Sequence, residues 1–406
     1  MSHAISSPNS TTDSLLIVGS PARINRVVLL LAVAALVAVF LLDIARIQPN
    51  RIVHGEGRSV IDALGIGGAL LVSLPFWLIA GLALRPTRAS SYVMLLLALA
   101  LLAALPWGLG WFSHHFIDPD QRAARVALAS GTWLLIFVLV LMLVDLRQRL
   151  RLGSGRSLFL WLVALGSPAL AYASGALDWL ALVREYQGRS DEFLRAILYH
   201  AWLVGMAVGF SLLIGFALAL LIRRAQGAQR GTFGVLSFIQ TIPSLALFGL
   251  LLAPLAWLSA QWPLLADMGV RGIGWAPALL ALIGYSLLPM TRNTFVALEG
   301  VSPAVIESAR GMGMSPLQVF VQVRLPLALP LLIEGVRITT VQAIGLAAVA
   351  ALIGAGGLGT FIFQGLGQAA MNLVMLGALP IILMALLVDA LLKAFADYFR
   401  HGEAID

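Results

Sequence analysis

Residues that could do chemistry are few in this chain. Gly354, Gly356 and Gly359 have the G-x-G-x-x-G spacing that lets a strand–turn–helix unit hold a dinucleotide pyrophosphate. Here the glycines follow a long apolar run instead of a soluble strand, so the pattern favours a close-packed turn over a nucleotide site. Lys393 is the only lysine and has no glycine loop before it, so the chain lacks a P-loop. We expect no ATPase site and no cofactor in this chain.

Metal and nucleophile chemistry is also not indicated. The chain has no cysteine, which excludes thiolate ligands and disulfides. Glu334 and Arg337 are three residues apart in one apolar run, so they can pair on one helix face. The isolated acidic residues lie near the ends of apolar runs, where water can solvate a carboxylate: Asp43, Asp62, Asp145 and Asp389. We expect no metal site, no nucleophile with a base, and no paired carboxylates within the membrane.

The composition is that of a membrane protein. Of the 406 residues, 60% are hydrophobic and 11% are charged, whereas a soluble domain has about 25% charged residues. Backbone amides in hydrocarbon must pair within their own segment, so each spanning run should be a helix. The sequence predicts an all-α, polytopic fold of about ten spans, at 27–45, 60–84, 91–112, 126–146, 157–177, 198–222, 232–258, 275–297, 327–353 and 372–396.

The arginines indicate the orientation. Placing the N-terminus in the cytoplasm puts most of them in inside segments, as the positive-inside rule requires. The net charge of +7 then reflects membrane topology and not nucleic-acid binding. Both termini should be cytoplasmic. A cleaved signal peptide is the competing interpretation of the first apolar run, but no small-x-small site follows that run.

Composition shifts suggest the domain boundaries. Residues 1–22 are polar and rich in Ser, and they are expected to be a disordered cytoplasmic tail. A polar stretch, 184–192, separates the first five runs from the last five. We expect an accessory N-terminal bundle at 23–183 and a core at 192–400.

The segment 305–330 interrupts two long apolar runs and is amphiphilic. Ser302 and Pro303 are suited to the N-cap and first position of a short helix, and Gly311 or Gly313 can end that helix with positive φ. Ser315-Pro316 then starts a second helix. Pro326 and Pro330 should break or bend the chain as it re-enters the membrane. The residues alone leave open whether this is a connecting loop or a docking element.

The same segment resembles the EAA loop of ABC-importer permeases, which is identified here at 299–326. Its pattern is matched by Glu307-Ser308-Ala309, Gly313, Val323 and Leu325-Pro326, with Ser in place of the middle Ala. The resemblance implies a type I ABC-importer permease core in the C-terminal half. It also implies contact with an ATP-binding subunit, which would hold ATP and Mg²⁺. The implied contact residues are Glu307, Ser308, Ala309, Arg310, Gly311 and Gly313, with Leu325 and Pro326 at the loop end.

Three further blocks resemble the glycine betaine/carnitine/choline class of these permeases: 239–247, 288–294 and 351–359. The resemblance covers about residues 195–400, so the first five spans fall outside it. It implies a non-enzymatic permease subunit of the bacterial inner membrane. Its implied partners are a second permease subunit, identical or related, and an external substrate-binding protein. A permease for another solute, such as an amino acid or methionine, is the first alternative, and a secondary carrier is the second.

Polar and glycine residues at membrane depth are candidates for a translocation path or a gate. They are Gln240, Thr241, Pro243, Ser244, Gln342, Gly356 and Gly357. The sequence leaves open whether the polar side chains line a path or only form interhelical hydrogen bonds. It leaves equally open whether the glycine turn is a gate or ordinary packing at a helix end. His200, at the outer edge of the sixth span, is expected to lie at the membrane interface.

Overall fold

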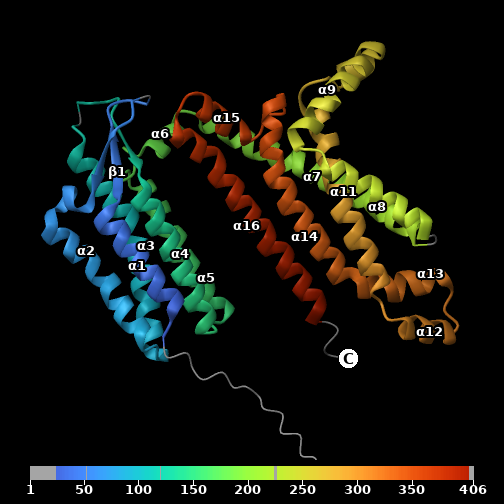
Figure 1. The fold of residues 1–406 in the computed structure, drawn as a ribbon, viewed down its shortest axis with the longest axis horizontal. Helices are drawn as coiled ribbons and strands as arrows, with labels where there is room; N and C mark the ends of the chain where they lie inside the picture. The colour runs from blue at the N-terminus through green and yellow to red at the C-terminus, as the bar shows by residue number, and fades with distance from the viewer. Residues whose placement is uncertain (1–23, 52, 119, 224–225, 402–406) are drawn as a thin grey trace, which may run out of the picture. The chain divides into compact units, whose positions relative to one another are not determined.

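The structure is a computed structural model, and it describes residues 24–51, 53–118, 120–223 and 226–401. The predicted tail at 1–22 lies outside the described residues. The chain divides into two compact units, with the division between Leu180 and Ala181 (Figure 1). Among the described helices, eight are long and apolar enough to cross a membrane.

The first unit is a helical bundle with a small sheet at one end (Figure 1). Helix α1 packs against α2 and α4, and its buried positions include Ala32, Ala35 and Val39, which are fully covered. The alanines at two of these positions let the neighbouring helices approach closely. The helices are α1 (Arg26–Leu41), α2 (Val60–Leu84), α3 (Arg88–Phe116), α4 (Ser130–Arg149) and α5 (Ser154–Ala173).

The sheet was not predicted. Strands β1 (Asp43–Gln48), β2 (Glu56–Ser59) and β3 (Arg125–Leu128) pair antiparallel in the order β2-β1-β3. The predicted first span was therefore wrong at its end, and the predicted fourth span was wrong at its start. The apolar residues there, such as Ala45 and Val126, are buried in strands, because short apolar runs fit a strand as well as a helix.

The second unit is built around α11, which packs against both α7 and α14, and these two helices also contact each other. Helix α14 in turn packs against α16. The helices that form these layers are α6 (Ala181–Gln187), α7 (Ser190–Ile222), α8 (Gln226–Thr241), α9 (Ser244–Gln261), α10 (Pro263–Asp267), α11 (Trp275–Glu299), α12 (Pro303–Gly311), α13 (Pro316–Gln318), α14 (Leu325–Val349), α15 (Gly359–Gly367) and α16 (Met371–His401).

The contacts of α11 depend on small residues. A Cβ on Gly215 of α7 would lie 3.0 Å from the Met290 side chain, and a Cβ on Gly335 of α14 would lie 2.6 Å from the Cβ of Asn293. Any larger residue at either glycine would push the helices apart. Glycine at these positions therefore sets the close spacing of α7, α11 and α14.

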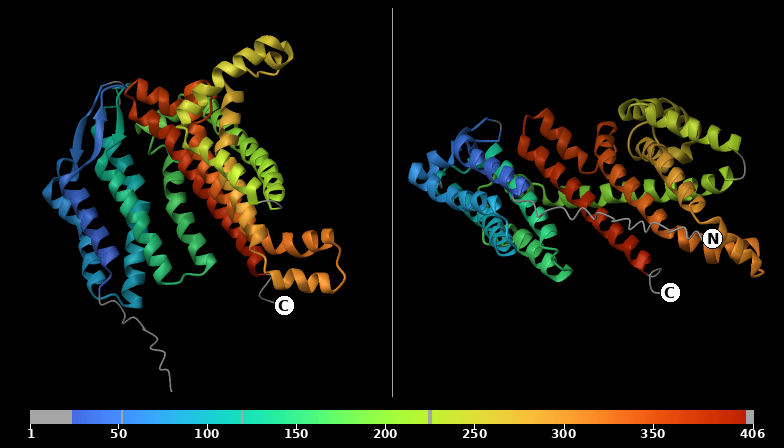
Figure 2. Two further views of the ribbon diagram at one scale, coloured as in Figure 1. Left: turned by 45° about the vertical axis from the view of Figure 1, so that its right-hand side comes forward. Right: turned by 60° about the horizontal axis from the view of Figure 1, so that its bottom comes forward.

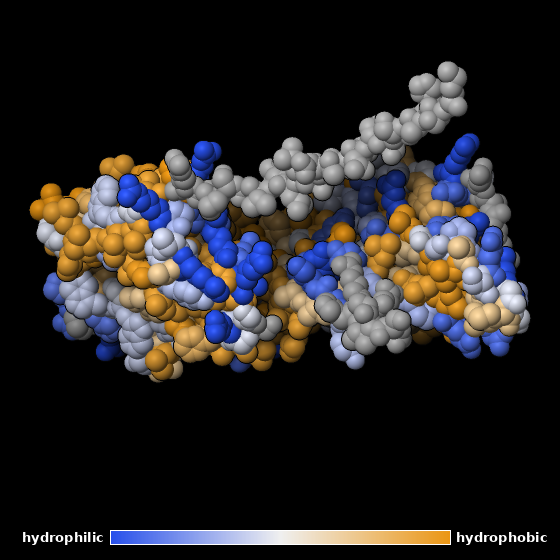
Figure 3. All heavy atoms as spheres, turned by 90° about the horizontal axis from the view of Figure 1, so that it is seen from below, coloured by the Kyte–Doolittle hydropathy of each residue, from blue (hydrophilic) through white to orange (hydrophobic). Residues whose placement is uncertain are grey.

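The outer surfaces of the long helices remain apolar. Leu213 and Leu221 on α7 and Leu386 on α16 are more than half exposed, and Figure 3 shows hydrophobic side chains over much of the face in view. Patches of this extent are rare on soluble monomers. Together with the eight apolar helices, they identify a chain that crosses the membrane several times.

Candidate functional site

A helical hairpin between α11 and α14 contains the segment that the sequence singled out (Figure 2). Pro303 occupies the first turn of α12, and Ser302 is at the N-cap without a side-chain cap hydrogen bond. At the other end, the amide of Met314 donates to the carbonyl of Ala309 and the amide of Gly313 donates to that of Arg310. This pair of bonds is the Schellman motif, which needs a left-handed residue at its turn. Gly313 provides it, with φ of 86°.

The second arm begins with a reciprocal cap. The Ser315 side chain accepts from the amide of Gln318, and the Gln318 side chain accepts from the amide of Ser315. The chain then turns as a π-helix, 319–324, where the amide of Leu325 donates to the carbonyl of Phe320. Pro326 lies in the first turn of α14, where its missing N–H costs little.

The helix does not end at Pro326 or Pro330, because the helical run continues from Pro316 to Ile353. Of the expected break or bend, only the break is contradicted. The π-helical turn shifts the hydrogen-bonding register just before Pro326, so the chain passes that proline without ending the helix. The hairpin is therefore continuous with a membrane-spanning helix and can move with it.

One side of the hairpin is packed and the other is open. Ile306 and Ala309 are buried against Val319 and against Leu298 at the end of α11. The other residues predicted to contact a partner are exposed: Glu307, Ser308, Arg310, Gly311 and Gly313. Met312 is 77% exposed and Leu317 is 71% exposed. Of the predicted contact set, Ala309 alone is buried, and it packs in a cluster with Leu298 and Val319.

A basic pocket lies beside the hairpin. It is lined in part by Arg223 directly after α7, Arg310 of α12 and Arg324 of the π-helical turn. Glu299, at the end of α11, pairs with Arg223 at 2.5 Å and with Arg324 at 3.6 Å. Among the described residues, Arg310 forms no ion pair, so its charge is available to a partner. Leu325 is partly buried and Pro326 is exposed at this end of the hairpin.

Four of the predicted path residues lie at a helix break. The predicted seventh span, 232–258, is two helices, α8 and α9, which meet at Pro243. Gln240 donates to the carbonyl of Tyr285 at 2.8 Å, and the Tyr285 hydroxyl donates to the carbonyl of Ile242. Thr241 bonds locally to the carbonyl of Phe238. Gln240 therefore makes an interhelical hydrogen bond, while Pro243 is exposed and Ser244 partly so.

The glycine-rich turn is a tight connection between α14 and α15. Gly354, Gly356 and Gly357 all have positive φ, which glycine adopts without strain. A Cβ on Gly357 would lie 3.2 Å from His200 Nδ1, and His200 Nε2 donates to the carbonyl of Ile344 at 3.0 Å. His200 is 1% exposed, so it packs inside the helical unit, and its expected level at the membrane interface stays a prediction.

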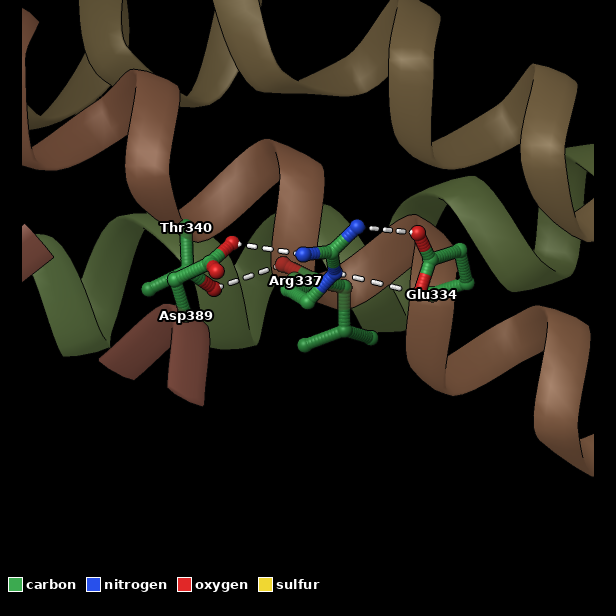
Figure 4. A network of polar contacts seen from close by, with 5 residues as sticks. Glu334, Arg337, Thr340 and Asp389 are labelled. Carbon is green, nitrogen blue, oxygen red and sulfur yellow. Dashed lines mark hydrogen bonds and ion pairs between the residues drawn. The ribbon is translucent and has the colours of Figure 1, made fainter. Parts of the chain in front are cut away.

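An ion-pair network crosses from α14 to α16 (Figure 4). Arg337 binds Glu334 through two nitrogens, as the spacing predicted, and it also binds Asp389 Oδ1 at 2.7 Å. The bond between Arg337 and Asp389 was not predicted, because Asp389 was expected at a solvated span end. A signal for it is that two isolated acidic residues, Glu334 and Asp389, share one arginine along two apolar runs. Gln342, also on α14, is exposed.

Comparison with known proteins assigns both units. Residues 24–183 match the N-terminal domain of the ABC transporter permease YehY. Residues 211–402 match the binding-protein-dependent transport system inner membrane component.

Three curated relatives match about half of the chain. The osmoprotectant import permease protein OsmW of Salmonella typhimurium is 41% identical, over 48% of this chain and 85% of the relative. The carnitine transport permease protein OpuCB of Listeria monocytogenes is 35% identical, over 52% and 88%. The choline transport system permease protein OpuBB of Bacillus subtilis is 34% identical, over 52% and 90%. The chain belongs to the family of binding-protein-dependent transport system inner membrane components, the permease subunits of ABC importers.

Proposed function

We propose that this permease imports a small osmoprotectant such as glycine betaine or choline, and that its helical hairpin couples the transport to ATP hydrolysis in a partner subunit. The similarity to an osmoprotectant import permease over 85% of that relative's length carries the proposal of the substrate. The carnitine and choline permeases among the relatives support the same class of solute.

The geometry of the hairpin supports docking of the ATP-binding subunit. The exposed side combines Glu307 and Arg310 with the apolar side chains of Met312 and Leu317. Apolar side chains surrounded by charges are typical of a protein interface. Methionine suits such a surface because its flexible side chain adapts to a groove. The hairpin thus offers a compact surface that a groove on the ATPase can enclose.

Coupling needs a stiff connection from that surface to the membrane. The buried side of α12 packs on the ends of α11 and α14 through Ile306, Leu298 and Leu332. The second arm continues into α14 without a break. A displacement of the hairpin must therefore move α14, which holds the ion-pair network. The ATP and Mg²⁺ belong to the partner, and its preference for a closed ATP-bound pair supplies the driving free energy.

Basic residues support the orientation. Arg223, Arg310 and Arg324 gather around one pocket at the hairpin end of the second unit. An excess of arginine marks cytoplasmic ends in membrane proteins. We therefore assign the hairpin to the cytoplasmic side of a bacterial inner membrane, and the arginine distribution along the sequence supports placing both termini on the same side. A second permease subunit, identical or related, completes the pathway, and an external binding protein delivers the solute.

Uptake measurements test the proposal. The chain is expressed with its ATP-binding subunit and its binding protein in a host without osmoprotectant uptake, and accumulation of labelled choline and glycine betaine is followed. We expect saturable uptake that stops when the catalytic glutamate of the ATPase is replaced. Uptake of methionine or another amino acid without choline or betaine would reassign the substrate. Undiminished uptake without ATP hydrolysis would indicate a secondary carrier.

A further inference from the structure

The first unit contains a pocket of about 310 Å³ lined by α2, α3 and α4. Its floor includes Leu135 and Leu139 of α4, which are buried. Its rim is exposed, with Leu64 on α2 and with Gly108 and Trp111 on α3. The pocket is therefore open between α2 and α3. Sites for small molecules have volumes of about 300–1,000 Å³, so this one is large enough to hold a ligand.

The backbone of α2 is interrupted twice where it borders the pocket. Its first turn is fixed by a reciprocal cap, in which the side chains of Ser59 and Asp62 each accept from the amide of the other. Gly65, next to the rim residue Leu64, then leaves the helical conformation with φ of 69° and ψ of 175°, a region that is open essentially to glycine alone. Pro75, which lines the pocket, removes a further amide from the helix. The shape of α2 beside the pocket is thus specified by its sequence.

The lining of the pocket is apolar. Of the described residues that form it, only Thr132 and Trp111 have a polar group in the side chain. The Thr132 hydroxyl already donates to the carbonyl of Ile44 at 2.6 Å, and Trp111 lies at the rim. A buried water needs about two to four polar partners, which this lining does not offer. The chemistry of the lining therefore calls for an apolar occupant.

The size of the pocket limits the occupant further. One turn of an α-helix is roughly 10 Å across and about 5.4 Å long, a volume of more than about 400 Å³. The pocket is smaller than this, so it does not take a helix of another chain. An extended peptide would bring backbone amides that an apolar lining leaves without hydrogen bonds, which is costly. A hydrocarbon chain has neither disadvantage.

We propose that this pocket binds one acyl chain of a membrane phospholipid. Both α2 and α3 are long and apolar enough to cross the membrane, so acyl chains are available at the opening between them. A chain that enters beside Gly108 would pack on Leu135 and Leu139 and supply the dispersion contacts that an empty pocket lacks. The lipid would thus complete the packing of α2 against α3 and α4. The proposal concerns the first unit alone and does not rest on the identity of the transported solute.

Photolabelling tests the site in the full transporter, held in vesicles of phosphatidylethanolamine and phosphatidylglycerol. A trace phospholipid carries a diazirine in one acyl chain, and mass spectrometry locates the adducts after illumination. Leu96 of α3 is 62% exposed outside the pocket and reports ordinary contact with lipid, whereas Leu135 is 8% exposed on the pocket floor. We expect adducts at both residues. Adducts at Leu96 without any at Leu135 would overturn the proposal.

A side chain that fills the pocket provides the matched comparison. A Cβ on Gly108 would meet no described neighbour within 4 Å, so G108F can place its ring in the opening. Labelling at Leu135, relative to that at Leu96, should then fall at least about tenfold, because the filled site has no room for a chain. Gly81 of α2 has the same open surroundings but lies outside the pocket. G81F should therefore keep the labelling ratio of the natural protein.

A second filling variant covers the case in which G108F does not fold. Ala104 lines the pocket from the same side of α3, one turn before Gly108, so A104F should also lower the labelling of Leu135. The melting temperature of each variant, compared with that of G81F, shows whether it is folded. Labelling of Leu135 that persists in a folded G108F or A104F would refute the proposal. None of these outcomes depends on uptake of choline or betaine, so the proposed function and this inference can fail separately.

Discussion

The hydroxyl of Tyr285 on α11 donates a hydrogen bond to the carbonyl of Ile242, the residue before the proline that separates α8 from α9. The carbonyl of Tyr285 itself accepts from the Gln240 side chain. One tyrosine thus ties the broken segment to the central helix through both its side chain and its backbone.

Replacing Tyr285 by Phe should destabilise the protein. The Ile242 carbonyl would lose its partner in an environment with little water, which costs about 1–3 kcal/mol. For a unit of this size we expect the melting temperature in detergent to fall by about 2–4 °C per kcal/mol. Tyr398, which is 75% exposed on α16, provides the control. Y398F should melt like the natural protein, and an equal fall in both variants would contradict the role of Tyr285.

Local backbone rules made the hairpin predictable. Pro303, Gly313 and Ser315 each impose a conformation on their own residue or turn, and the structure has the expected helix, turn and second helix. The π-helical turn and the continuous helix through Pro326 were not predictable, because residue types do not indicate which carbonyl each amide bonds to within a helix.

Partners from distant elements were not predictable either. Glu334 and Arg337 are neighbours on one helix, and their pairing was confirmed. Asp389 joins them because α14 packs on α16, and His200 is buried between Gly357 of the glycine turn and Ile344 of α14. The sheet was not predicted for a related reason, because β1 and β3 are far apart in the sequence and pair only in the folded chain.

The turn of the hairpin should tolerate no side chain at Gly313. A β-branched residue at φ of 86° is strained by more than the roughly 1–2 kcal/mol of the left-handed region, so the Schellman motif would open and α12 would shift. We expect G313V to insert into the membrane in normal amounts while uptake falls at least about tenfold. Gly155, an exposed glycine in the first turn of α5 whose added Cβ would meet nothing, provides the control variant G155V. Normal uptake by G313V would argue against mechanical coupling through this turn.

The exposed tip of the hairpin should be needed to hold the ATPase. Met312 is 77% exposed, so a charge there leaves the fold intact but would be buried without a partner in an interface. We expect M312E to fold with an unchanged melting temperature and to lose co-purification of the ATP-binding subunit. Val53, an exposed apolar residue in the first unit, serves as the matched control, and V53E should retain the complex. If M312E also retained it, the docking surface would lie elsewhere.

Gly356 and Gly357 offer a test of the glycine turn. A side chain at either position would have nearly the same backbone strain, but it would meet different neighbours. Both have φ near 77°, at 76° and 78°, so alanine at either should cost about 1–2 kcal/mol. A Cβ on Gly356 would make an ordinary contact with the Tyr199 ring at 3.5 Å, whereas one on Gly357 would press on His200 at 3.2 Å. His200 cannot easily move aside, since its other nitrogen is bonded to Ile344. We therefore expect G357A to be the less stable variant by about 1 kcal/mol or more.

Adding H200A should reduce the cost of G357A and leave that of G356A unchanged. Equal costs for the two alanines, with no relief from H200A, would mean that the turn is constrained by its backbone alone.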